Sequence, residues 1–163
     1  MIRVLDILED TMVDGPGFRT SIYCAGCSHQ CKGCHNPQSW AFDGGHEMTT
    51  TDILKIIMDD PFANVTFSGG DPMFQAAGFA ELARAIHEYT NKDIWCYTGF
   101  VFESLIQEDQ RELLEQIDVL VDGPYIESLR DPDLQFRGSS NQRLIDVPAS
   151  LYEGKVVLWQ SNL

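Results

Sequence analysis

Basic residues are scarce in this sequence, and long apolar runs are absent. The 163 residues include 11 Lys and Arg against 25 Asp and Glu, which gives a formal net charge of −14. Binding to nucleic acids or anionic membranes needs clustered Lys and Arg, and no such cluster occurs. No apolar run approaches the roughly 20 residues that span a bilayer. We therefore expect neither a nucleic-acid partner nor a membrane partner.

The features of a secretion signal and of a disulfide scaffold are also missing. The first residues, MIRVLDILED, carry acidic side chains where a signal peptide has a basic start and an apolar core. The cysteines are Cys96 and four residues between positions 24 and 34, whereas disulfide scaffolds spread their cysteines along a small secreted chain. We therefore expect a cytoplasmic protein whose cysteines serve metal binding or redox chemistry.

The rest of the sequence alternates apolar strands with helices, which predicts parallel strands joined by helices. A full eight-fold barrel needs about 250 residues. The expected fold is therefore α/β, a partial and open β/α barrel of about four to six parallel strands, in a single domain over residues 1–163. The expected strands are 20–24, 64–68, 93–97, 118–122 and 155–159, with edge strands at 3–7 and 143–147. The expected helices are 49–60, 75–90, 100–107 and 109–117.

Four polar or Gly-rich loops follow predicted strands. They are the cysteine loop after 20–24, SGGDP after 64–67, TGF after 93–97 and DGPY after 118–121. In folds of parallel strands the loops at the carboxyl ends of the strands carry the chemistry. We expect these four loops to open on one rim and to form an active site.

The cysteine loop reads CAGCSHQCKGC, and its spacing allows three interpretations. A closed zinc site would use four cysteines, or three cysteines and His35, but paired zinc knuckles usually lie 12 to 20 residues apart. A ferredoxin cluster uses C-x2-C-x2-C and a remote Cys-Pro, whereas Cys96 is followed by Tyr97. In the third interpretation Cys24 is a buried strand-end thiol. The remaining three cysteines then hold three irons of a [4Fe–4S] cluster, and the fourth iron stays open.

The spacing Cys27-x3-Cys31-x2-Cys34 after a first strand resembles the signature of radical S-adenosylmethionine enzymes. DGPGFR at 14–19 resembles the glycyl-radical activating enzymes. CKGCHNP, FSGGDP, CYTGF, VLVDGPY and FRGSSNQRLID resemble the activating proteins of the anaerobic ribonucleoside-triphosphate reductase. The resemblance covers about residues 4 to 160 and implies the partial barrel of the radical S-adenosylmethionine type.

The resemblance implies that Cys27, Cys31 and Cys34 bind a [4Fe–4S] cluster whose open iron chelates S-adenosyl-L-methionine. Reductive cleavage would give a 5′-deoxyadenosyl radical that takes a hydrogen atom from a glycine of the large subunit of the anaerobic ribonucleotide reductase. The electron donor would be a flavodoxin or a thiol reductant system. The implied cofactor contacts are Gly33, Cys34 and His35 near the adenine, Ser68, Gly69, Gly70 and Asp71 near the methionine amino group, and Thr98 and Asp122 near the ribose or carboxylate.

Other interpretations of these features remain open. The chain could activate another glycyl-radical enzyme, such as pyruvate formate-lyase, or it could be a zinc-stabilised interaction module without catalysis. SGGDP could be an ordinary turn, and the polar segment 137–143 could cap a sheet edge or supply a further ligand contact through Asn141 or Arg143. We expect His29, His46 and His87 at the surface and Cys96 in a structural role.

Overall fold

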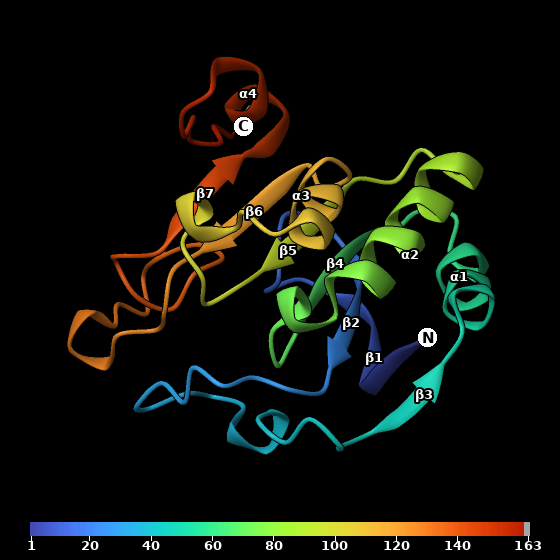
Figure 1. Cartoon of the computed structure of the whole chain (residues 1–163), viewed down its shortest axis with the longest axis horizontal. Helices are drawn as coiled ribbons and strands as arrows, with labels where there is room; N and C mark the ends of the chain where they lie inside the picture. Colours follow the sequence, from blue (N-terminus) through green and yellow to red (C-terminus); the bar gives the residue numbers. More distant parts are fainter. Residues whose placement is uncertain (162–163) are drawn as a thin grey trace.

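A seven-stranded sheet organises the chain in the computed structural model, which describes residues 1–161 (Figure 1). The strand order is β3-β1-β2-β4-β5-β6-β7. The strands are β1 (Ile2–Thr11), β2 (Arg19–Cys24), β3 (His46–Met48), β4 (Asn64–Gly69), β5 (Ile94–Tyr97), β6 (Val119–Asp122) and β7 (Arg143–Asp146). The helices are α1 (Thr50–Asp59), α2 (Ala76–Tyr89), α3 (Glu108–Leu114) and α4 (Val147–Glu153). Short 3₁₀ turns lie at Pro37–Ser39, Pro72–Gln75, Phe102–Ser104 and Glu127–Leu129.

Four central strands run parallel, and the others are antiparallel additions. β2, β4, β5 and β6 pair in parallel register, and the chain passes through α1, α2 and α3 between them. β1 and β3 extend the sheet beyond β2, and β7 extends it beyond β6. The expected α/β class is confirmed as a mixed α/β fold. Within residues 1–161, each helix is too short or too polar to cross a bilayer.

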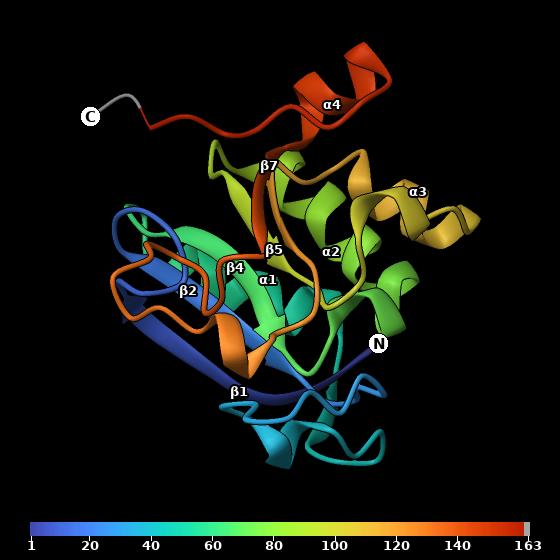
Figure 2. The same cartoon turned by 90° about the vertical axis from the view of Figure 1, so that its left-hand side faces the viewer.

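The main hydrophobic core lies between the sheet and the helices. Every second residue of the parallel strands faces α1, α2 and α3, because side chains alternate along a strand. Phe67 of β4 packs against Phe79 of α2 with 4.7 Å between ring centroids. Figure 2 shows α2 and α3 on one side of the sheet and the loop between β1 and β2 on the other. The buried strand residues of this core include Ile22, Val65, Phe67, Ile94, Cys96 and Leu120.

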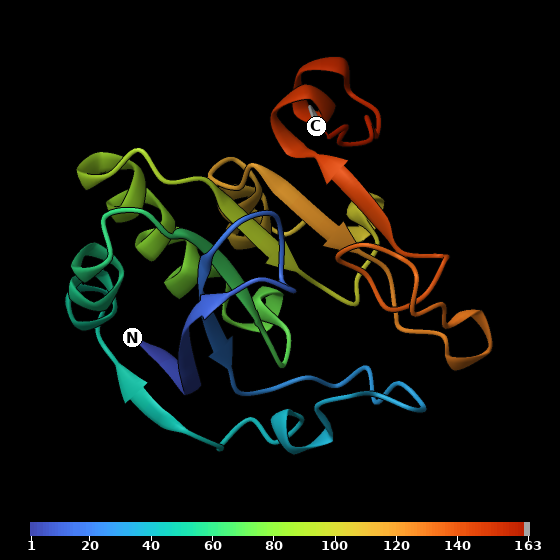
Figure 3. The same ribbon diagram turned by 180° about the vertical axis from the view of Figure 1, so that it is seen from behind.

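The opposite face of the sheet is only partly covered. Trp95 lies there in edge-on contact with Phe136 and Trp159. The loop at 12–18 crosses the same face, as Figure 3 shows from behind. Arg19 is fully buried beneath it and donates hydrogen bonds to Pro16 O and Val65 O. The amino-terminal half of this face is therefore filled, and the half near the carboxyl ends of the strands is more open.

Two expected strands differ from the structure. Residues 155–159 form only an isolated bridge from Leu158 to Ile145 of β7, with hydrogen bonds from Asp146 N to Val157 O and from Trp159 N to Leu144 O on either side of it. The chain enters this segment through a turn at Gly154 (φ 72°). The expected edge strand at 3–7 is β1, which is longer and lies inside the sheet. The edge position is taken by β3, a strand of three residues whose polar sequence HEM gave no signal. The edge strand at 143–147 is confirmed as β7.

The helices were predicted more accurately, with two exceptions. α1 begins where expected, because Thr49 Oγ1 accepts a hydrogen bond from Asp52 N at 3.1 Å. The helix expected at 100–107 is only the 3₁₀ turn Phe102–Ser104. The short helix α4 was not expected, since Pro148 and its few apolar positions hide the helical pattern; Asp146 caps it.

Candidate active site

The four loops expected at one rim do converge there. β2, β4, β5 and β6 are parallel, so their carboxyl ends meet at one end of the sheet. In Figure 1 the cysteine loop after β2 and the long segment after β6 extend from the same end. Gly123 N, after β6, donates a hydrogen bond to Phe100 O, after β5, at 2.9 Å. The predicted co-location of these loops is confirmed.

The cysteines divide into two environments. Cys24 is fully buried at the end of β2, and burial raises the pKa of its thiol well above the usual range. Cys27, Cys31 and Cys34 lie on the following loop and are partly exposed. Burial raises the pKa of Cys27 to about 11, and the neighbouring charges of Asp71 and of the other two loop cysteines act in the same direction. Among residues 1–161, no three His, Cys, Asp or Glu side chains are already gathered as a metal site.

The glycine loop, SGGDP at 68–72, is held by hydrogen bonds against the start of the cysteine loop. Gly70 N donates to Cys24 O at 2.7 Å, and Asp71 N donates to Gly26 O at 2.8 Å. A Cβ on Gly69 would lie 2.4 Å from Cys24 N, and a Cβ on Gly70 would lie 2.5 Å from Gly26 O. Gly69 also has a φ of 104°. Glycine is required at both positions because two backbones touch there.

Asp71 joins three of the rim loops through one buried carboxylate. It is 1% exposed. Its Oδ1 accepts from Met73 N at 3.0 Å, which starts the turn after the glycine loop. Its Oδ2 accepts from Thr98 Oγ1 and Gly99 N, both at 2.9 Å. His29 Nε2 lies 2.7 Å from the same oxygen. Thr98 thus contacts Asp71 from the carboxyl end of β5.

His29 is not the surface residue that the sequence suggested. Its side chain is only 18% exposed. The ring packs against Phe74 and Phe100, with centroid distances of 5.6 and 4.6 Å. The prediction of a surface position was wrong because the partner of His29, Asp71, is 42 positions away in the sequence. The only available signal was its position between Cys27 and Cys31.

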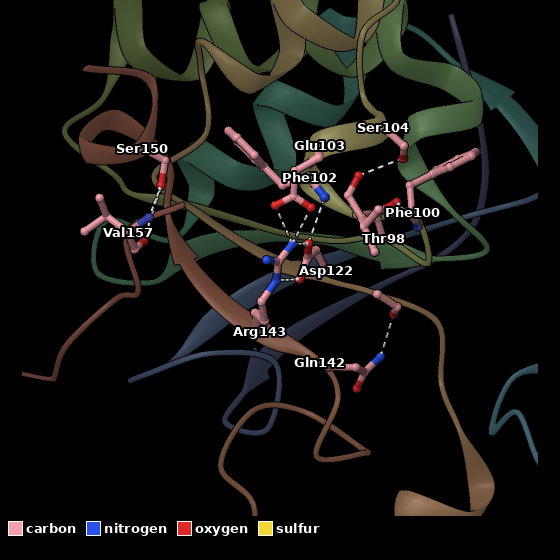
Figure 4. Close-up of polar contacts among 12 residues, drawn as sticks. Thr98, Phe100, Phe102, Glu103, Ser104, Asp122, Gln142, Arg143, Ser150 and Val157 are labelled. Carbon is pink, nitrogen blue, oxygen red and sulfur yellow. Dashed lines mark hydrogen bonds and ion pairs between the residues drawn. The ribbon is translucent and has the colours of Figure 1, made fainter. Parts of the chain in front are cut away.

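Asp122 is engaged by Arg143 at the carboxyl end of β6 (Figure 4). Arg143 Nε and Nη2 donate to the two oxygens of Asp122 at 3.0 and 2.6 Å. Arg143 also donates to Glu103, and Asp122 accepts from Phe102 N at 2.8 Å. These contacts raise the pKa of Arg143 and lower that of Glu103. Arg143 therefore ties β7 to the rim.

The tip of the cysteine loop meets the segment after β6. Gly33 has a φ of 79°, and a Cβ there would lie 3.0 Å from Glu127 Cδ. The His35 ring packs against Tyr125 with 5.3 Å between centroids. Cys34 N donates to Cys31 O at 3.1 Å, which forms the turn that carries Gly33. The predicted adenine-side residues thus lie together at the outer end of the rim.

A groove of about 510 Å³ opens beside the glycine loop. Tyr23, Asn36, Ser39, Ser68 and Gly69 are among its lining residues. Its volume lies within the range of pockets that bind small molecules. The groove therefore brings the end of β4 together with the chain that follows the cysteine loop.

Two acidic residues, Asp6 and Asp14, also line this groove. Asp14 Oδ2 accepts hydrogen bonds from Tyr23 OH and from Ser21 Oγ. A second groove of about 500 Å³ shares Asp14 and includes His35 and Tyr97. The sequence gave no signal for Tyr23, and Asp14 stood out only as the first residue of DGPGFR.

Comparison with known proteins places this chain in a family. A model of a 4Fe-4S single cluster domain matches residues 13–145. The anaerobic ribonucleoside-triphosphate reductase-activating protein of Vibrio cholerae is 42% identical over 139 residues, which covers 80% of this chain and 89% of the relative. The protein of the same name from Haemophilus influenzae is 37% identical, with 86% and 96% covered. The one from Escherichia coli K12 is 36% identical, with 80% and 90% covered. The chain therefore belongs to the family of anaerobic ribonucleoside-triphosphate reductase-activating proteins.

Proposed function

We propose that this chain is a radical S-adenosylmethionine enzyme that activates an anaerobic ribonucleotide reductase. Family membership gives the reaction class, and the relatives' names give the reductase as the target. The observation that carries the proposal is the loop of Cys27, Cys31 and Cys34 at the carboxyl end of a parallel strand, clamped to a glycine loop.

The residues present fit a [4Fe–4S] cluster with one open iron. Cys27, Cys31 and Cys34 are three partly exposed thiols on one short loop, and they would hold three irons. Cys24 is buried on the helix side of β2, so it would leave the fourth iron free. Binding would also gather the three thiols, because metal binding is coupled to the ordering of such loops. The bound cluster would supply the electron for cleavage of S-adenosylmethionine to the 5′-deoxyadenosyl radical that takes a hydrogen atom from a reductase glycine.

We propose the groove beside Ser68 and Gly69 as the binding site of S-adenosylmethionine. The molecule carries a sulfonium and an ammonium group, and the groove offers the carboxylates of Asp6 and Asp14. We expect Ser68, Gly69 and the Gly70 backbone to lie at its methionine end. Its adenine would lie toward Gly33, Cys34 and His35.

Three of the residues predicted to contact S-adenosylmethionine form hydrogen bonds with other residues of this chain. Asp71, Thr98 and Asp122 are each nearly buried, and their side chains bind neighbouring groups of the rim. We propose that they hold the rim in the shape that receives S-adenosylmethionine. Direct contacts of these side chains with its amino, ribose or carboxylate groups stay predictions.

The remaining features follow from the same proposal. The four parallel strands and their open face are consistent with a partial β/α barrel, and one sheet with one main core supports a single domain over residues 1–163. We propose a cytoplasmic location because the reaction needs reduced thiols and a low-potential electron. The donor would be a flavodoxin or a thiol reductant system.

The test is formation of 5′-deoxyadenosine. The protein is reconstituted with iron and sulfide without oxygen, reduced with dithionite and given S-adenosylmethionine, first alone and then with the anaerobic reductase of the same organism. We expect product above the level of a Cys31→Ala control and a glycyl-radical electron paramagnetic resonance signal on the reductase. Bound zinc without iron would favour the interaction module. Product without a radical on this reductase, but with one on pyruvate formate-lyase, would favour that other target.

A further inference from the structure

We infer that His29 is a positioning residue of the cysteine loop. Its hydrogen bond to Asp71 holds the cysteine loop against the glycine loop, and we call this contact the lock. The inference rests on the proposed function for its catalytic meaning, but the lock itself is a property of the protein alone. His29 lies midway between Cys27 and Cys31. His29 would not bind the cluster itself, but it would fix the orientation of the Cys27 and Cys31 thiolates toward the cluster.

The geometry of His29 is that of a held side chain. Nε2 lies 2.7 Å from Asp71 Oδ2, which is hydrogen-bonding distance. Phe74 and Phe100 pack around the ring, which limits its rotation. A Cβ added at Gly99 would lie 2.6 Å from the His29 ring, so that glycine makes room for it. The loops after β4 and β5 therefore enclose this imidazole of the cysteine loop.

The lock acts where the backbone gives the cysteine loop little support. The beginning of the loop is held by hydrogen bonds from Gly26 N to Ser39 O and from Cys27 N to Trp40 O. The far turn is internal, from Cys34 N to Cys31 O. His29 sits between these points and connects the loop interior to the end of β4. Loss of this contact would free the segment that carries Cys31.

The carboxylate of Asp71 keeps hydrogen-bond donors when the His29 side chain is removed. The carboxylate still accepts from Met73 N, Thr98 Oγ1 and Gly99 N. A His29→Ala variant should therefore keep the fold and lose the hydrogen bond to Asp71 together with the ring contacts to Phe74 and Phe100. Residues that orient metal ligands from outside typically change metal affinity or activity by about 10- to 100-fold when mutated.

The first measurement uses the iron-free protein. Hydrogen–deuterium exchange of peptides covering 25–35 is compared in the parent, His29→Ala, His29→Gln and the control His46→Ala, whose side chain is exposed on β3. We expect faster exchange in His29→Ala alone, since a Gln amide can still donate to Asp71. Equal exchange in the parent and His29→Ala would overturn the lock.

The second measurement follows the reconstituted cluster in the same four proteins. We expect His29→Ala to release iron to a chelator about 10- to 100-fold faster than the parent. Addition of S-adenosylmethionine should also change the electron paramagnetic resonance spectrum of the reduced cluster differently in His29→Ala and in the parent. His29→Gln should recover toward the parent, and His46→Ala should match it. Faster exchange with unchanged iron release and spectra would overturn the role toward the cluster. A parent protein that assembles no cluster would instead contradict the proposed function, and the exchange data would still decide the lock.

Discussion

At the scale of single residues, Gly70 shows that glycine in this loop serves contact between two backbones. A Cβ at position 70 would lie 2.5 Å from Gly26 O and 2.8 Å from its carbonyl carbon. The neighbouring hydrogen bonds from Gly70 N and Asp71 N fix this spacing. Substitution at Gly70 would therefore push the cysteine loop away from β4.

Gly70→Ala should lower the free energy of unfolding by about 1–3 kcal/mol, the usual cost of overpacking, and should also reduce the iron bound after reconstitution. Urea unfolding and iron analysis measure the two effects. Gly154→Ala is the matched control, because its Cβ meets open space and the cost is only that of φ 72°. Both variants should lose stability, and only Gly70→Ala should lose iron. Normal iron binding in Gly70→Ala would contradict the clamp between the two loops.

The cysteine variants test which thiols belong to the site. Cys24→Ala should retain most of the iron and most of the S-adenosylmethionine cleavage, because Cys24 is fully buried in the core. Cys27→Ala, Cys31→Ala and Cys34→Ala should each abolish cleavage. Iron, sulfide and 5′-deoxyadenosine are measured in all four variants. Loss of the cluster in Cys24→Ala, with folding shown by circular dichroism, would restore the four-cysteine site.

At the scale of elements, β7 is joined to the turn before α3 by an ion-pair network whose strength depends on pH. Arg143 bridges Asp122 and Glu103. Its hydrogen bond is the main cause of the lowered pKa of Glu103. A carboxylate with a lowered folded pKa stabilises the protein above its unfolded pKa of about 4.3. That stabilisation disappears as the pH falls through the folded value.

Glu103→Gln should therefore be less stable than the parent at pH 7, and the difference should shrink as the pH falls below about 4. Glu103 is 59% exposed, so we expect about 0.2–1 kcal/mol at neutral pH, the range for exposed pairs. Urea midpoints at pH 7, 4 and 3 measure the difference, and Glu112→Gln on the exposed side of α3 is the control. A difference that grows on acidification would have the wrong sign for this network.

The elements also show what the sequence could predict. The four parallel strands were found because they are largely buried and rich in Val, Ile, Leu and aromatic residues, as in NVTF and DVLV. β3 was missed because an edge strand of three polar residues has no such pattern. Residues 155–159 have the composition of a strand, but they follow a turn at Gly154 and only partly pair with β7. Composition indicates a tendency to form a strand, whereas pairing depends on the path that the chain takes past its neighbours.

For the site, the sequence predicted which loops come together but not the contacts between them. Strand order placed the four loops on one rim, since parallel carboxyl ends must meet. The contacts within the rim were beyond reach, because they join residues far apart in sequence, such as His29 with Asp71 and Asp122 with Arg143. The sequence thus indicated which loops form the site, and the structure shows what holds them together.

At the scale of the whole molecule, a cluster should couple the rim to global stability. The cysteine loop packs on the glycine loop, on Tyr125 and, through the ring of His29, on Phe100 after β5. A group that binds the folded chain and not the unfolded one stabilises it by mass action. An intact cluster would also hold the loop at three points.

Anaerobic reconstitution should therefore raise the Tm of the protein, and removal of the iron with a chelator should lower it again. Scanning calorimetry without oxygen measures both changes, with Cys31→Ala treated in parallel to subtract adventitious iron. Cys24→Ala should show the same rise as the parent, because its thiol lies outside the site. A rise of equal size in Cys31→Ala would mean that iron binds elsewhere on this acidic surface. An unchanged Tm in a parent protein with a full cluster would mean that the loop is mechanically separate from the sheet, which the clamp between β2 and the glycine loop argues against.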